Sequence, residues 1–97
     1  MLTMEPGGEG IVLVKGRLDA AQAASAQAYL DKLQGTVTLD LAGLDYISSA
    51  GLGVLLKTQK RLTGSGGKVR LTAVSAHLRD IFVYSGFDQL FEIESSK

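Results

Sequence analysis

The sequence predicts an α/β fold with a mainly parallel, mixed sheet of four to five strands and three helices. Short runs rich in β-branched residues alternate three times with longer runs rich in alanine and leucine, and a short apolar run follows at the end. This alternation is typical of parallel strands joined by helical crossovers. The length of 97 residues is that of one domain, so we expect a single domain over residues 1–97.

The composition excludes several classes of function. The chain is 45% hydrophobic and 21% charged, which is typical of a globular protein. Ten basic and ten acidic residues give a formal charge of zero, so we expect no nucleic-acid partner. The absence of cysteine and the single histidine, His77, argue against disulfides and metal sites. Because no apolar run approaches the ~20 residues of a membrane span, we expect a cytoplasmic protein without membrane insertion.

The N-terminal third is predicted to hold two strands and the start of a helix. Residues 2–5 suit a short edge strand, because a proline and glycines follow. Residues 11–14 form a continuous apolar run, which predicts a strand covered on both faces, and residues 16–18 then form a loop. Asp19 is the expected helix N-cap, with Gln22 as the second half of a capping box.

The middle of the chain predicts a helix followed by a strand. Apolar residues at helical spacing indicate a helix over residues 20–33, which Gly35 ends. Residues 36–41 alternate between apolar and polar side chains and therefore predict a strand. Residues 42–48 are expected to connect this strand to the next helix.

The remaining chain predicts two more helices and two more strands. The helices are expected over residues 50–63 and 76–84, the second one capped by Ser75. The strands are expected over residues 69–74 and 90–93.

Ligands and partners of open α/β sheets gather beyond the carboxyl ends of the strands. Three predicted loops lie there, at residues 15–19, 42–49 and 74–75. The middle loop is the most unusual, because Ser48 and Ser49 place two hydroxyls where a helix begins. The unpaired amides and partial positive charge of a helix start stabilise a phosphate. The plain alternative is that one of these serines only caps the helix.

Spacing excludes the common catalytic motifs. The glycine pair of the second predicted helix lacks the third glycine of a dinucleotide site, and a strand follows residues 64–68 where a phosphate loop needs a helix. A serine hydrolase would need His77 as its base, and the serines lack the Gly-x-Ser-x-Gly context. Asp40 and Asp45 are interpreted as strand-end and turn residues. We therefore expect no enzymatic activity and no cofactor.

Three separated segments match one family signature in order and spacing. They are residues 16–19 (Gly-Arg-Leu-Asp), residues 39–55 with their Tyr-Ile-Ser-Ser-Ala-Gly-Leu-Gly centre, and residues 85–91 (Ser-Gly-Phe-Asp-Gln-Leu-Phe). Together they resemble the STAS domain of bacterial anti-sigma factor antagonists (anti-anti-sigma factors). The resemblance implies a STAS fold with its core at residues 11–93.

The resemblance also assigns roles to the serine loop. The family motif is Asp-Ser-Ser/Thr-Gly, and its first serine accepts a phosphate. Alignment on Gly51 places this acceptor at Ser49, with Ser48 as the alternative. Ser48 stands where the family has aspartate, and Ala50 stands where it has serine or threonine. The partner-binding residues implied are Asp19, Ser48, Ser49, Ala50, Gly51 and Leu52.

The function implied is that of a phosphoprotein that binds another protein and is not itself an enzyme. The expected partner is an anti-sigma factor with a histidine-kinase-like ATPase fold, which binds the unmodified chain and phosphorylates the serine. A separate serine phosphatase would reverse the modification. The main alternative is a constitutive scaffold subunit of a signalling complex or lipid transporter, without phospho-switching. A small-ligand or nucleotide site at the strand ends is a further alternative.

Overall fold

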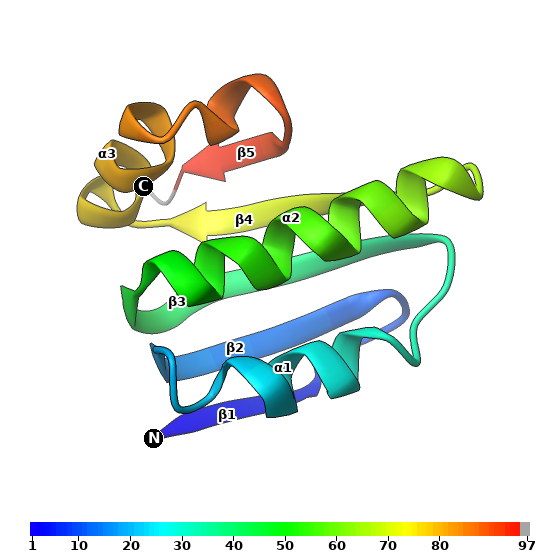
Figure 1. The fold of residues 1–97 in the computed structure, drawn as a ribbon, viewed down its shortest axis with the longest axis horizontal. Coiled ribbons are helices and arrows are strands. Elements are labelled where there is room, and N and C mark those ends of the chain that lie inside the picture. Colours follow the sequence, from blue (N-terminus) through cyan, green and yellow to red (C-terminus); the bar gives the residue numbers. More distant parts are fainter. Residues whose placement is uncertain (96–97) are drawn as a thin grey trace.

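The computed structural model describes residues 1–95 and confirms the predicted fold class (Figure 1). A mixed five-stranded sheet has the order β1-β2-β3-β4-β5, in which β1 is antiparallel to β2 and the other pairs are parallel. The strands are β1 (Leu2–Pro6), β2 (Ile11–Leu18), β3 (Thr36–Ile47), β4 (Lys68–Val74) and β5 (Glu92–Ser95). The helices are α1 (Ala23–Leu30), α2 (Ser49–Gly64), α3 (Ala76–Tyr84) and the 3₁₀ helix η1 (Phe87–Gln89).

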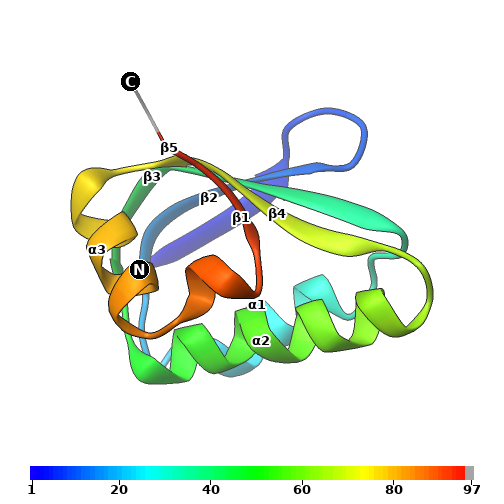
Figure 2. The ribbon, with the colours of Figure 1, turned by 90° about the horizontal axis from the view of Figure 1, so that it is seen from above.

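The helices lie on one side of the sheet (Figure 2). The strand order follows the chain order, so each right-handed crossover moves the chain in the same direction and places its helix on the same face. This corrects the expectation that residues 11–14 are covered on both faces. Val12 and Val14 are buried beneath the helices, whereas Ile11 and Leu13 are only partly buried on the other face.

One apolar core fills the space between the sheet and the helices. An aromatic row closes it at the β5 end, where the Phe87 ring stacks on Phe82 and Phe91 with centroid distances of 6.3 and 5.1 Å. The sequence did not predict η1, which places Phe87 in this row. The other buried apolar side chains include Val12, Val14, Leu30, Val37, Leu39, Leu41, Val54, Leu55, Leu62, Val69, Leu71 and Leu78.

Two predicted loops are in fact the ends of strands. β2 continues through residues 16–18 and β3 through residues 42–47, and their register shifts between Leu13 and Lys15 and again between Gly16 and Arg17. Such irregularities let the two strands stay paired beyond the regular ladder. Gly16 has a φ of +97°, and a side chain there would meet the Met1 carbonyl oxygen.

Two other boundaries also differ from the prediction. The first helix covers only Ala23–Leu30, with a turn at residues 20–22 ahead of it and another at residues 31–32 after it. It therefore ends three residues before the predicted residue 33, and Gly35 is not its stop. The last strand begins at Glu92, because the Phe91 amide donates a hydrogen bond to the Phe87 carbonyl oxygen and so belongs to the turn after η1. By contrast, α3 spans the predicted residues 76–84, and the Ser75 side chain caps it.

Candidate functional site

The ends of β2 and β3 bring the predicted site residues to one edge of the sheet. Leu18 and Ile47 are the last register partners of this strand pair, so Asp19 and Ser48 follow them side by side. The Ser48 amide donates a hydrogen bond of 3.0 Å to the Leu18 carbonyl oxygen. This bond joins the end of β2 to the N-cap of α2.

The two serines have different environments. Ser48 is the N-cap of α2, with extended backbone angles (φ −94°, ψ 174°), and its Oγ accepts a hydrogen bond of 3.2 Å from the Gly51 amide. Ser49 is the first residue of the helix and is exposed. Within residues 1–95, no hydrogen bond involves the Ser49 hydroxyl. Capping therefore accounts for the Ser48 hydroxyl but not for the Ser49 hydroxyl.

Gly51 allows α2 to approach the end of β2. It is buried, and a Cβ at this position would lie 2.7 Å from the Leu18 carbonyl oxygen and 2.8 Å from Ile47 Cγ1. Only glycine fits such a close approach without movement of the backbone. Ala50, in contrast, is exposed, and Leu52 is partly buried against the core.

Asp19 does not cap α1, which corrects the predicted capping box. Its Oδ1 accepts a hydrogen bond of 3.2 Å from the Gln22 amide. However, α1 begins only at Ala23, and its N-cap is Gln22, whose side chain makes no capping hydrogen bond. Asp19 instead closes the turn over residues 19–22. Its half-buried carboxylate remains at the same edge as Ser48 and Ser49.

Arg17 is a site residue that sequence reasoning missed. Its guanidinium lies over the Tyr46 ring, 4.3 Å from the centroid, and its Nε lies 4.0 Å from Asp19 Oδ2. The cation therefore offsets the nearby carboxylate and stacks on an aromatic face. The signal was hidden because the Arg17–Tyr46 pairing depends on the shift in strand register.

Three other candidate groups, His77, Asp40 and Asp45, form no hydrogen bond to Ser48 or Ser49. His77 is exposed on α3, and no hydrogen bond links it to either serine. Asp40 is half-buried and its carboxylate accepts a hydrogen bond from the Ala42 amide, while Asp45 is exposed. Among residues 1–95, no three histidine or acidic side chains are grouped to hold a metal ion.

Comparison with known proteins identifies the family. A protein-family model described as "Mlab, STAS domain" matches residues 1–92. The chain belongs to the STAS domain family. A relative from Bordetella bronchiseptica, the candidate anti-sigma factor antagonist BtrV, is 39% identical over 99% of this chain and 87% of its own.

Solved structures share the STAS fold at low identity. Protein TM1081 of Thermotoga maritima has a TM-score of 0.80 at 19% identity, over 97% of this chain and 86% of its own. The phosphorylated form of SpoIIAA from Bacillus has a TM-score of 0.71 at 20% identity, over 96% of this chain and 90% of its own. The same fold covers 16% of the murine anion transporter Slc26a9, with a TM-score of 0.70 at 20% identity over 91% of this chain. In this STAS chain, none of the helices described is long and apolar enough to cross a membrane.

Proposed function

We propose that this STAS protein is an anti-sigma factor antagonist whose binding is switched by phosphorylation of Ser49. In this proposal the unmodified chain binds an anti-sigma factor with a histidine-kinase-like ATPase fold in the cytoplasm. That partner transfers a phosphoryl group from ATP to Ser49, and a separate serine phosphatase removes it. The STAS chain contributes the acceptor hydroxyl and the binding surface, and it is not an enzyme.

The observation that carries the proposal is the exposed, unused hydroxyl of Ser49 beside the capping hydroxyl of Ser48. A phosphate on Ser48 would replace the hydroxyl that caps α2. A phosphate on Ser49 would leave that cap intact. The 39% identity to a candidate anti-sigma factor antagonist supports the same role.

The first turn of α2 favours a phosphate in the free protein. This turn contains no acidic residue, and its amides and helix dipole stabilise negative charge. In a complex built around a neutral hydroxyl, a phosphate adds about −1.5 to −2 charges that must lose their water. A penalty of about 3 kcal/mol would weaken binding roughly 150-fold.

The test compares Ser49→Ala and Ser49→Asp as paired baits in a lysate of the source cells, with mass spectrometry of the captured proteins. We expect the alanine bait to retain a kinase-like ATPase and the aspartate bait to lose it. The captured ATPase, incubated with ATP, Mg²⁺ and the wild-type chain, should add one phosphate to the peptide that contains Ser49. Ser48→Ala is the control for the adjacent hydroxyl and should still be phosphorylated.

A constitutive scaffold is the second candidate. It is favoured by Ser48 in the place of the family aspartate, and the STAS fold also occurs within an anion transporter. In that case both Ser49 baits would retain the same partner. No phosphate would be transferred to either serine.

A further inference from the structure

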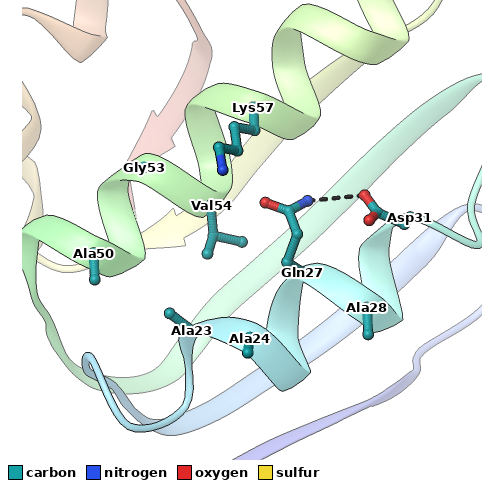
Figure 3. A pocket seen from close by; sticks show the side chains of 9 residues that line it. All are labelled: Ala23, Ala24, Gln27, Ala28, Asp31, Ala50, Gly53, Val54 and Lys57. Atoms are coloured by element: carbon teal, nitrogen blue, oxygen red, sulfur yellow. Dashed lines mark hydrogen bonds between the residues drawn. The ribbon is translucent and has the colours of Figure 1, made fainter.

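A groove of about 460 Å³ runs between α1 and α2 (Figure 3). It begins at Ala50, the residue that follows Ser49, and continues along α2 to Lys57. Its walls are mostly small or apolar side chains, which are Ala23, Ala24, Ala28, Ala50, Gly53 and Val54. The groove is therefore continuous with the surface that carries the proposed phosphate acceptor.

Packing within the chain does not explain the glycine in this groove. Gly53 lies inside α2, where glycine destabilises a helix relative to alanine. A Cβ on Gly53 would meet no atom within 4 Å, whereas a Cβ on Gly51 would lie 2.7 Å from the Leu18 carbonyl oxygen. Gly51 is thus required by the fold. Gly53 instead keeps the groove open.

The groove also presents a cation without a partner. Lys57 is exposed on α2 and directed toward the groove, and among the described residues it forms no ion pair. Asp31, on the α1 side, is already engaged: Gln27 Nε2 donates a hydrogen bond of 2.9 Å to its Oδ1, and Arg61 Nε lies 3.9 Å from that oxygen. α2 contains no acidic residue. The groove therefore favours an occupant with negative charge opposite Lys57.

We infer that this groove receives a helix of the anti-sigma partner, with a small or apolar ridge against Gly53 and an acidic side chain at Lys57. The inference rests on the proposed function and extends its binding surface along α2. A groove between two helices accepts the ridge of a third, and small walls allow a close approach. The acidic side chain supplies orientation, because charge complementarity fixes register.

The test uses two pairs of matched variants in the full chain. Gly53→Leu fills the groove, while Gly64→Leu adds the same side chain at the end of α2, where a Cβ also meets no atom within 4 Å. Lys57→Glu reverses the charge in the groove, while Lys60→Glu makes the same change one turn from Lys57 at a residue that does not line it. The probe is the purified ATPase captured by Ser49→Ala, and the dissociation constant is measured by calorimetry.

We expect Gly53→Leu and Lys57→Glu each to weaken binding by about tenfold or more, since buried anchors and charge pairs dominate such interfaces. Both control variants should stay within about twofold of the wild type, well below the tenfold that 1.4 kcal/mol produces. Thermal unfolding verifies that all four variants are folded. Hydrogen exchange should show new protection of residues 23–31 and 50–57 in the complex.

The outcomes distinguish this inference from the proposed function. If the Ser49→Ala bait captures no ATPase, the proposed function fails and the inference fails with it. If the ATPase binds folded Gly53→Leu as tightly as the wild type, only the inference is overturned. A monomer–dimer equilibrium that Gly53→Leu abolishes and Gly64→Leu preserves, seen by ultracentrifugation, would assign the groove to a second copy and would also overturn it.

Discussion

The Ser48 amide and the Leu18 carbonyl oxygen are joined by a hydrogen bond of 3.0 Å across the ends of two neighbouring strands. The same carbonyl oxygen limits the space beside Gly51. The position of Ser49 is therefore set by β2 as well as by its own helix.

Gly51→Ala should destabilise the protein by about 1–3 kcal/mol, because the added methyl group overpacks the contact between α2 and Leu18. Urea unfolding measures the effect. Gly53→Ala is the matched control in the same helix and should be neutral or stabilising by up to about 1 kcal/mol. Equal stability of the two variants would show that α2 does not approach β2 as closely as described.

Ser48→Ala should lower the free energy of unfolding by about 1 kcal/mol, because the Gly51 amide loses its side-chain acceptor. Ser48→Asp should restore most of this loss, since aspartate caps helices and interacts favourably with the helix dipole. Ser49→Ala is the control and should change stability by less than about 0.5 kcal/mol, as for an ordinary surface position. A larger loss for Ser49→Ala than for Ser48→Ala would contradict the assignment of the cap.

Ala73→Gly should stabilise the protein by up to about 1 kcal/mol, which thermal unfolding can detect. Ala73 has a φ of +54°, a left-handed conformation that costs an alanine about 1–2 kcal/mol and that glycine adopts readily. The register of β4 and β5 shifts around this residue. Ala24→Gly, at an exposed position in α1, is the control and should destabilise by about 1 kcal/mol.

Glu92 should make the free energy of unfolding depend on pH in the acidic range. Hydrogen bonds from Lys68 (Nζ–Oε1, 2.7 Å) and Arg70 hold the pKa of the Glu92 carboxyl below its ordinary value of 4.5. A carboxyl whose pKa is lowered by folding stabilises the folded protein at a pH above its ordinary pKa. This stabilisation is lost as the pH falls through the lower pKa of the folded state. Glu92→Gln should remove that part of the pH dependence.

The measurement for Glu92 is the urea midpoint of wild type and Glu92→Gln as a function of pH. The two curves should differ at neutral pH and converge under acidic conditions. The difference should be small and should shrink further in high salt, because all three side chains are exposed. Curves that stay parallel across the whole range would refute the prediction.

Local sequence patterns were enough to predict the bounds of some helices and strands but not of others. The bounds of α3 were predictable because Ser75, the buried Leu78 and Phe82, and the Ser85–Gly86 stop lie within one short segment. The extension of β2 was not predictable, because it depends on how the chain pairs with β3 around Gly16. The partial exposure of residues 11 and 13 depends on the strand order, which no local pattern reveals.

The candidate site was predictable in its position but not in its detail. Two serines at a predicted helix start, and the resemblance of the surrounding residues, were enough to select Ser48 and Ser49. Deciding which serine caps α2 required the distance from Ser48 Oγ to the Gly51 amide. The stacking of Arg17 on Tyr46 required the irregular strand register.

The sequential strand order has a consequence for how the chain can fold. Among the five strands of residues 1–95, none is inserted between two earlier ones, so each new strand adds to the outer edge of the sheet already formed. Contacts between neighbouring strands span only one connecting segment, which keeps contact order low for a largely parallel sheet and favours rapid folding. During synthesis, β1 to β3 with α1 could assemble while the last third of the chain is still in the ribosome. Each later helix–strand unit would then dock onto a template that is already complete.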